Sequence, residues 1–192
     1  DKDLDLFVVS GGNEFYGKSK YRQPQLYLND GKGQFTKKGN LPELYLTGSC
    51  AKANDIDKDG DLDIFLGART IPWQYGIPPD SYILLNDGEG NFTDASTTID
   101  PGLKEFGFVK DATWADIDND GDDDLLIAAE WRPLTIFYND KGRLELHKDS
   151  GLDHVSGWWN AITTADFDQD GDLDIVVGNL GLNSKLKADV NS

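Results

Sequence analysis

Three copies of one acidic pattern carry the clearest chemistry of this chain. Each reads Asp-x-Asp-x-Asp-Gly-Asp-x-Asp, and the copies span residues 55–63, 116–124 and 166–174. Five carboxylates crowded on one short loop repel each other unless a cation neutralises them. Ca²⁺ accepts six to eight oxygen ligands in a flexible cage, whereas Mg²⁺ demands octahedral geometry and keeps several waters. The pattern therefore predicts three Ca²⁺ sites.

The flanks of these loops argue against an EF-hand. That motif needs a glutamate at the twelfth position and a helix on either side. Here the twelfth positions are Leu66, Ile127 and Val177. Repeat-in-toxin nonapeptides also differ, because their pattern is richer in glycine and lacks a spacing near 50 residues. The loops are therefore expected to join β-strands, with the acid at the ninth position as the last of the loop.

The acidic loops belong to a longer repeat, since their starts are 61 and 50 residues apart. A short strand of small and branched residues precedes each loop, at 51–54, 112–115 and 162–165. An apolar run that reads as a buried strand follows each loop, at 62–68, 124–130 and 173–179. Further segments pair a strand with a hairpin turn centred on Asn-Asp, at 25–35, 82–92 and 134–144. A short alternating strand follows each turn.

The unit is therefore four strands, with the calcium loop between the first and the second. A four-stranded antiparallel sheet repeated at a period near 50 residues is typical of a β-propeller blade. The fold class expected is all-β, and no segment has the periodicity of a helix.

The first twelve residues resemble the later repeats but lack the start of the acidic pattern. Asp1, Asp3 and Asp5 match its last three acids, and Lys2 replaces the glycine, so no complete site is expected there. We expect one partial propeller over 1–192, with about three to three and a half blades. The repeats are expected at approximately 1–48, 49–105, 106–155 and 156–192. A closed ring typically has four to eight blades, so the missing ones would come from the rest of the same propeller or from another copy.

These units resemble FG-GAP repeats, also catalogued as VCBS repeats, of the integrin-α-like propeller family. Phe106-Gly107 precedes the second loop, and Gly67-Ala68-Arg69 approximates the later Gly-Ala-Pro of the family. The NDGxGxF turns and the segment 157–183 are similar to large secreted or surface proteins of bacteria. The resemblance covers essentially the whole chain and implies a calcium-binding propeller.

The resemblance also implies a role for each loop position. Positions 1, 3 and 5 would bind Ca²⁺ through side chains, position 7 through its carbonyl, and position 9 through both carboxylate oxygens. The glycine at position 6 would take the positive φ of a sharp turn. The residues are Asp55, Asp57, Asp59, Asp61 and Asp63; Asp116, Asp118, Asp120, Asp122 and Asp124; and Asp166, Asp168, Asp170, Asp172 and Asp174, with Gly60, Gly121 and Gly171.

The net charge of −17 argues against a nucleic-acid partner and against an anionic membrane. Of the 35 acidic residues, 16 lie in the three loops, so the acidity is largely a signature of the metal sites. No apolar run approaches the ~18 residues of a membrane helix, so membrane insertion is not expected. Cys50 is the single cysteine, which excludes an intrachain disulfide. Weak calcium sites fill outside the cytosol, which favours an extracellular, cell-surface or periplasmic protein.

The remaining candidate residues are aromatic. Trp73 and Tyr75 lie in an insertion between two strands, and we expect them to be exposed and to contact a ligand. The other tryptophans are expected to pack between repeats; they are Trp114, Trp131, Trp158 and Trp159. His147 and His154 have no nucleophile motif nearby, and Cys50 reads as a small buried residue of a strand.

The function expected is a calcium-binding module that mediates adhesion or binds a glycan or protein ligand, with structural calcium. No catalytic constellation is visible, so we do not expect an enzyme. Two alternatives stay open. The chain could be part of a propeller-type polysaccharide lyase or another carbohydrate-active enzyme, or it could be a structural spacer in a large surface protein.

Overall fold

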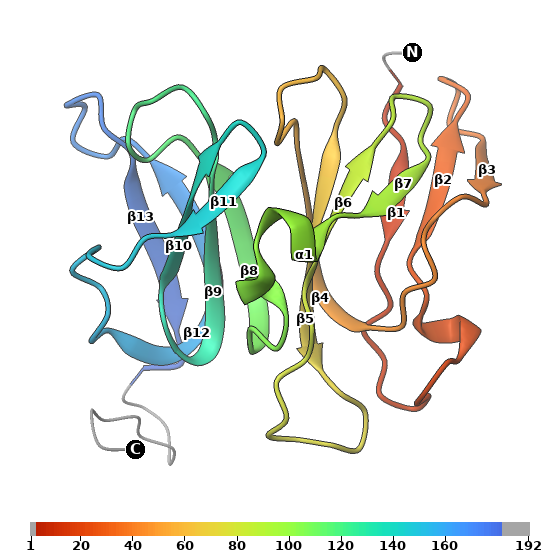
Figure 1. Cartoon of the computed structure of the whole chain (residues 1–192), viewed down its shortest axis with the longest axis horizontal. Coiled ribbons are helices and arrows are strands. Elements are labelled where there is room, and N and C mark those ends of the chain that lie inside the picture. Colours follow the sequence, from red (N-terminus) through yellow and green to blue (C-terminus); the bar gives the residue numbers. More distant parts are fainter. Residues whose placement is uncertain (1–2, 182–192) are drawn as a thin grey trace.

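The computed structural model describes residues 3–181, and in this range the protein is almost entirely β-structure. Its strands form antiparallel sheets that stand side by side along the long axis of the molecule (Figure 1). The first sheet has the order β1-β2-β3, with β1 (Leu6–Val8), β2 (Gln25–Asn29) and β3 (Phe35–Lys38). The prediction of an all-β, antiparallel fold is confirmed.

The next two units are four-stranded meanders in sequence order. One contains β4 (Thr47–Asn54), β5 (Asp63–Thr70), β6 (Tyr82–Asn86) and β7 (Phe92–Asp94). The other contains β8 (Phe108–Ala115), β9 (Asp124–Pro133), β10 (Thr135–Asp140) and β11 (Arg143–Leu146). In both, an acidic loop joins the first strand to the second, as the sequence predicts.

The last acidic loop joins β12 (Ser156–Ala165) to β13 (Asp174–Asn179). The first residues of β12 pair with the end of β9, where Trp158 lies opposite Glu130, so these strands continue the third sheet. The end of the predicted fourth repeat, residues 182–192, lies outside the described residues, as do Asp1 and Lys2.

The expectation of no helix is wrong for one short segment. Ser96–Ile99 forms α1, a single turn, and two short 3₁₀ segments occupy Lys20–Arg22 (η1) and Pro101–Leu103 (η2). The side chain of Asp100 accepts a hydrogen bond from the Gly102 N–H at the start of η2. Turns of this length are set by local capping rather than by a periodic apolar face, which is why the hydrophobic pattern does not reveal them.

The strands after the acidic loops are apolar throughout because both of their faces are covered. On β5, Ile64 and Leu66 pack toward the first sheet, while Phe65 packs toward the third. On β9 the alternation repeats: Leu125 and Ile127 face the second sheet. Leu126 and Ala128 face β12 and β13. Strands buried on both faces read as continuous apolar runs instead of alternating ones.

Equivalent positions at the two ends of the array are more exposed. Leu6 and Val8 of β1 correspond to Ile64 and Leu66, but they are 46% and 39% exposed. Val176 of β13 corresponds to the fully buried Phe65 and is 47% exposed. Among residues 3–181 no further sheet covers these two outer faces.

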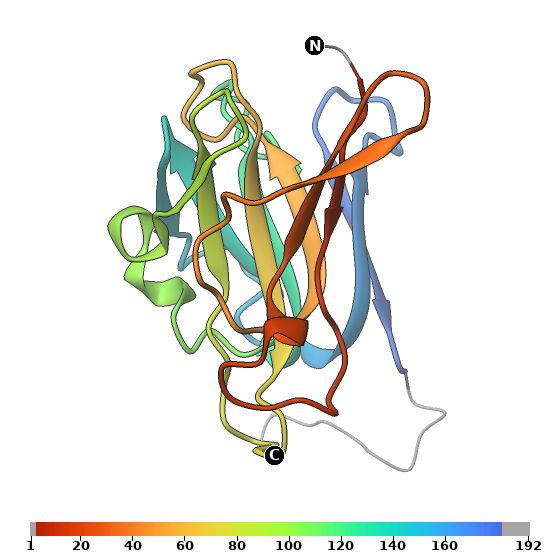
Figure 2. The ribbon, with the colours of Figure 1, turned by 90° about the vertical axis from the view of Figure 1, so that its right-hand side faces the viewer.

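The acidic loops gather at one end of the sheets, and the long β5–β6 loop lies at the opposite end (Figure 1; Figure 2). This separation follows from the meander. Successive connections alternate between the two ends, so the first-to-second connections share one end and the second-to-third connections share the other. The fold therefore provides two functional ends with different chemistry.

We expect Phe65→Ala to destabilise the protein by about 3–5 kcal/mol, because the side chain is fully buried between the second and third sheets. Urea unfolding at a fixed calcium concentration measures this loss. Phe35→Ala is the matched control, since Phe35 is 48% exposed on β3. Equal losses in the two variants would contradict the packing described here.

Candidate metal centres

Each acidic loop brings three carboxylates together. The side chains at positions 1, 3 and 9 offer oxygens that all lie within 4.8 Å of each other, in each of the three loops. These groups are Asp55, Asp57 and Asp63; Asp116, Asp118 and Asp124; and Asp166, Asp168 and Asp174. The same cluster thus forms three times, in loops that start 61 and 50 positions apart in the chain.

The backbone of each loop is shaped by its own carboxylates. The position 1 side chain accepts the N–H of the glycine at position 6, at 3.1, 3.0 and 3.1 Å in the three loops. The position 5 side chain accepts the N–H of position 7, at 3.0, 2.8 and 3.0 Å. The three glycines have φ of 99°, 94° and 99°, so the predicted need for glycine is confirmed.

Position 4 also has a positive φ, which the sequence does not suggest. Lys58, Asn119 and Gln169 have φ of 60°, 58° and 63°. Because this conformation costs free energy for residues other than glycine, it marks the loops as constrained by their surroundings.

The acid at position 9 connects the loop to the rest of its sheet. Asp63 accepts the Ile56 N–H at 3.1 Å with one oxygen and the Asn86 N–H, at the end of β6, at 2.8 Å with the other. Asp124 repeats both contacts with Ile117 and Asn139, at 3.0 and 2.9 Å. We call this pair of contacts the aspartate clamp. In the incomplete first repeat, Asp5 keeps one contact, to the Asn29 N–H at 2.8 Å.

Burial of the clamp carboxylates changes their titration. Asp63 and Asp124 are each 1% exposed, and desolvation raises the pKa of both to about 6, although the hydrogen bonds from backbone N–H groups oppose the rise. Neighbouring loop aspartates add to it by repulsion. A bound cation would reverse this balance, because it stabilises the ionised form.

The first cluster contains a polar atom with no partner. One oxygen of Asp55 is buried and accepts no hydrogen bond, while its other oxygen accepts the Gly60 N–H. An unpartnered buried carboxylate oxygen is unfavourable unless a cation is bound to it. The donor set of carboxylate oxygens suits a hard cation, so these residues fit the expected metal. Positions 5 and 7 lie outside the clusters, and their proposed part in binding stays a prediction.

Neighbouring loops are connected through position 4. The Lys58 ammonium forms an ion pair with Asp122, at position 7 of the next loop, and donates to the Gly121 carbonyl at 2.6 Å. The Asn119 amide donates to Asp172 at the same place one repeat later, at 2.9 Å. The ammonium of Lys58 lowers the pKa of Asp122. We call these contacts, from position 4 of one loop to position 7 of the next, the 4-to-7 contacts. The sequence does not reveal them, because the residues that they join are more than 50 positions apart.

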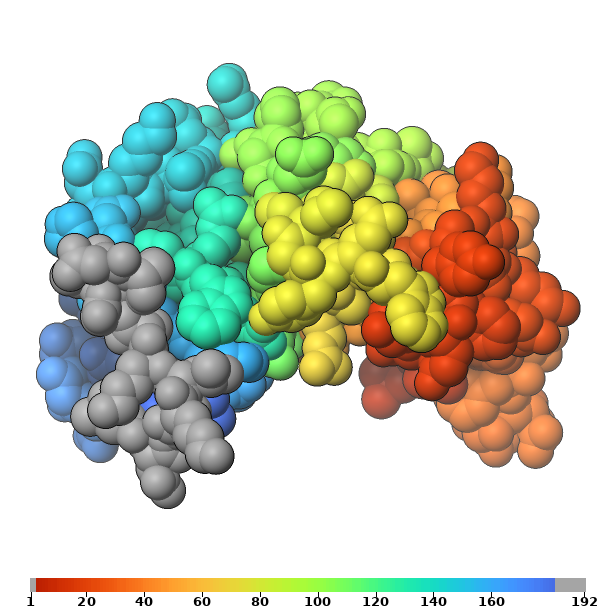
Figure 3. All heavy atoms as spheres, turned by 90° about the horizontal axis from the view of Figure 1, so that it is seen from below, coloured from red at the N-terminus to blue at the C-terminus, as the bar shows by residue number. Residues whose placement is uncertain are grey.

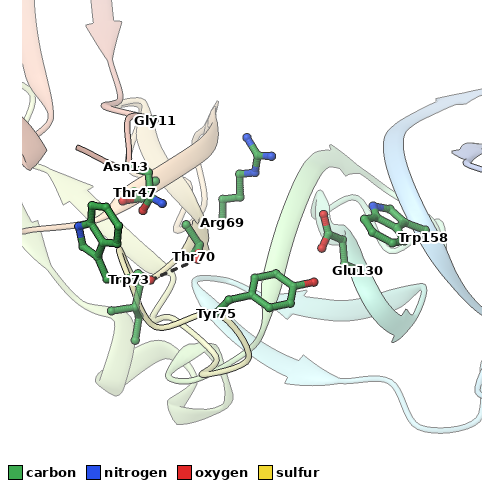
Figure 4. Close-up of a pocket in the computed structure, with 10 residues that line it drawn as sticks. Gly11, Asn13, Thr47, Arg69, Thr70, Trp73, Tyr75, Glu130 and Trp158 are labelled. Carbon is green, nitrogen blue, oxygen red and sulfur yellow. Dashed lines mark hydrogen bonds between the residues drawn. The ribbon is translucent and has the colours of Figure 1, made fainter. Parts of the chain in front are cut away.

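At the opposite end, Trp73 and Tyr75 are exposed, as predicted, at 76% and 71%. They line a cavity of about 560 Å³ together with Arg69, Glu130 and Trp158 (Figure 4). The sequence gives no sign that the last three would meet here, because they come from three different strands.

The expected packing of the other tryptophans is partly wrong. Trp159 is buried, and the Trp114 indole N–H donates to the Lys52 carbonyl at 3.2 Å across two sheets. Trp131, however, is 42% exposed and contacts Trp158, which lines the cavity. Trp131 follows the last buried residue of β9, and Trp158 lies on β12 opposite Glu130, so their position in the fold rather than their hydrophobicity decides their exposure.

The two histidines and the cysteine lie outside this cavity. His147 stacks on Tyr138 at 4.4 Å, and His154 is exposed away from the cavity. Cys50 is half-buried on β4, and desolvation raises the pKa of its thiol to about 11, which disfavours a reactive thiolate at neutral pH.

A model of the FG-GAP-like repeat matches residues 1–66, 55–127 and 116–177. The chain belongs to the FG-GAP-like repeat family. Each match ends within the apolar strand that follows an acidic loop. A search of curated proteins finds no match.

FG-GAP-like repeats are typical of extracellular proteins, and the present chain is a repeat module of that type. None of the helices in residues 3–181 is long and apolar enough to cross a membrane. The acidic clusters of this repeat protein are groups that could hold metal ions.

Without metal, we expect the protein to be more stable at pH 5 than at pH 7.5. The folded-state pKa values of Asp63 and Asp124 are raised to about 6, above the unfolded values near 4. The folded state therefore binds more protons between these pH values, and this stability is lost as the pH rises through about 6. Urea unfolding in EDTA at the two pH values tests it. A metal-free protein that is more stable at pH 7.5 would contradict the assignment.

We expect Asp124→Asn to destabilise the metal-free protein by about 1–3 kcal/mol. An amide has one acceptor oxygen, so one of the two clamped N–H groups would lose its partner while buried. Urea unfolding in EDTA at pH 7.5 measures the change. Asp123→Asn is the control, because this neighbouring side chain makes neither contact. Similar behaviour of the two variants would be evidence against the clamp.

Proposed function

We propose that the protein is a calcium-stabilised β-propeller module of an extracellular, cell-surface or periplasmic protein, and that it binds a glycan or protein ligand without catalysing a reaction on it. The observation that carries the proposal is the threefold recurrence of one carboxylate cluster with the same local hydrogen bonds. A cation site that is repeated in one chain requires the same arrangement of carboxylates each time, and these loops have it.

Calcium is the ion that best suits these clusters. Their donors are carboxylate oxygens, and the loop glycines allow a cage of several such oxygens within a few residues. When bound, the ion neutralises the mutual repulsion of the loop. Hydrogen bonds of the chain itself set the shape of the loop. The side chain at position 1 holds the turn, and the aspartate clamp holds the loop against the third strand of its sheet. The calcium is therefore structural in this proposal.

The propeller arrangement is supported by the relation between successive sheets. Equivalent residues of β5 and β9 alternate between the preceding and the following sheet, so each unit uses the same two faces. The 4-to-7 contacts join equivalent points of neighbouring loops. The outer faces at Leu6 and Val176 present positions that are buried elsewhere. Further blades would cover these faces, as an array of this kind requires.

Ligand binding is proposed for the end that lies opposite the acidic loops. There Trp73 and Tyr75 extend from a long loop into a cavity bounded by several repeats. The histidines lie outside this cavity, which favours binding over acid–base catalysis. Calcium at the far end would act by stiffening the sheets from which the cavity residues project.

The proposal predicts that calcium raises the melting temperature by several degrees or more. A ligand at 100 times its Kd stabilises the folded state by about 2.7 kcal/mol per site. Thermal unfolding followed by circular dichroism, in EDTA and in calcium, measures the shift, with magnesium at equal concentration as the comparison. Identical melting curves in EDTA and calcium would refute structural calcium.

We further expect titration calorimetry to give three bound Ca²⁺ ions per chain, and two after Asp166→Asn combined with Asp168→Asn. This loop is the most exposed of the three, so the change leaves the buried clamps of the other two intact. Replacement of Asp149 and Asp153 by asparagine, outside all three loops, is the control. An unaltered count in the loop variant would remove the third site from the proposal.

A further inference from the structure

The end of the molecule opposite the acidic loops contains two cavities that share one wall. One has a volume of about 560 Å³ and the other about 540 Å³, and Ile71 and Trp73 line both. Ligand pockets in proteins commonly have volumes of 300–1,000 Å³. Figure 3 shows this end of the molecule, with the yellow β5–β6 segment projecting between the red N-terminal segment and the teal end of β9.

Each cavity contains an arginine without an acidic partner. The ion pairs among residues 3–181 all involve lysines, and neither Arg22 nor Arg69 belongs to one. This is unusual in a chain with a net charge of −17, in which carboxylates greatly outnumber basic groups. The fold thus keeps both guanidinium groups away from its many aspartates.

Arg22 is the more buried of the two arginines, with a relative exposure of only 7%. One guanidinium N–H donates to the Gly17 carbonyl at 2.8 Å, but the buried Nε has no partner. Buried charges are normally paired, since desolvation of an unpaired ion is costly. Arg22 lines the second cavity, so an anionic group bound there would give its charge a partner, and a carboxylate matches the fork of an arginine.

Arg69 lies in the other cavity and is exposed, with its side chain extending into open space (Figure 4). The acid of this cavity, Glu130, is already neutralised by Lys110 at 2.8 Å. The charge that remains available to a ligand is therefore positive. Glu130 can still accept hydrogen bonds from hydroxyl groups, and the amide of Asn13 can both accept and donate them.

Trp73 separates the two cavities in a strained conformation. Its φ is 65°, a value that costs free energy for a bulky residue, and turns at Ile71–Gln74 and Gln74–Ile77 hold the segment. The indole is nonetheless largely exposed, and Tyr16 and Tyr75 are exposed beside it at 73% and 71%. A strained backbone that presents an apolar ring to solvent indicates a surface built for contact.

We propose that this end binds an acidic saccharide, a chain of sugar rings that carry carboxylates, with Trp73 stacked on a ring and Arg22 and Arg69 bound to carboxylates on either side. Flat sugar faces pair with exposed aromatic rings, and sugar hydroxyls suit the mixed donors and acceptors of the first cavity. An acidic peptide would satisfy the arginines but has no ring to cover the indole. The inference rests on the proposed ligand-binding role and names its chemical class.

The test uses titration calorimetry with the full chain in calcium and a tetramer of galacturonic acid as the probe. We expect binding to the unaltered protein and at least a tenfold loss of affinity in Arg69→Gln and in Trp73→Ala. Both side chains are exposed, so these variants should fold. Arg143→Gln is the matched control, because Arg143 is an exposed arginine on β11 outside both cavities, and its affinity should not change.

Three comparison ligands make the outcome decisive. The fully methyl-esterified tetramer should not bind, and equal binding would overturn the need for a negative charge. A sulfated tetrasaccharide that bound instead of the uronate would overturn the carboxylate assignment. A glutamate-rich peptide that bound as tightly, with the same dependence on Arg69, would overturn the saccharide class. Absence of binding to every probe, with the calcium-induced rise in melting temperature intact, would refute this inference and leave the calcium proposal standing.

Discussion

The aspartate clamp is the contact on which the arrangement of the second and third sheets depends. A single carboxylate, Asp63 or Asp124, fixes the start of the acidic loop and the end of the third strand at the same time. Without it, the loop would keep only the hydrogen bonds among its own residues, and this carboxylate would no longer hold it to the third strand of its sheet. The burial that makes the clamp specific also raises the pKa of its carboxyl group. The folded loop is thus prepared for a cation, because a positive charge offsets that desolvation.

The same loops also connect the repeats. Lys58 reaches the next loop at Asp122, and Asn119 reaches the one after at Asp172. Ile56, the residue after the first aspartate, is fully buried against the third sheet, and its carbonyl accepts a hydrogen bond from Asn139 at 3.0 Å. Each loop therefore contributes both to its own sheet and to the next. A cation that orders one loop therefore also orders the surface on which the next repeat packs. This is the coupling between nearest neighbours that is usual in repeat proteins.

The two ends of the sheets carry different chemical groups. Carboxylates gather at one end, where the loops are short and nearly identical, and the repeats keep their geometry. The other end varies, with a long aromatic loop in one repeat and two arginines free of acidic partners. Because rigid strands separate the two ends, the loops at the aromatic end can vary without disturbing the acidic loops at the other end. This is usual when binding loops project from a stable scaffold.

The sequence alone predicts the repeat, the strands that follow each acidic loop, the glycine turns and the three groups of aspartates, because each copy of these features lies within a short segment of the chain. The tertiary structure adds that positions 1, 3 and 9 form the cluster without position 5, and that Lys58 meets Asp122. It also decided the exposure of Trp131 and the meeting of Arg69 with Glu130 and Trp158. The contacts of Lys58 and Arg69 join residues more than 50 positions apart, and their partners follow from sheet packing, which a local pattern does not encode.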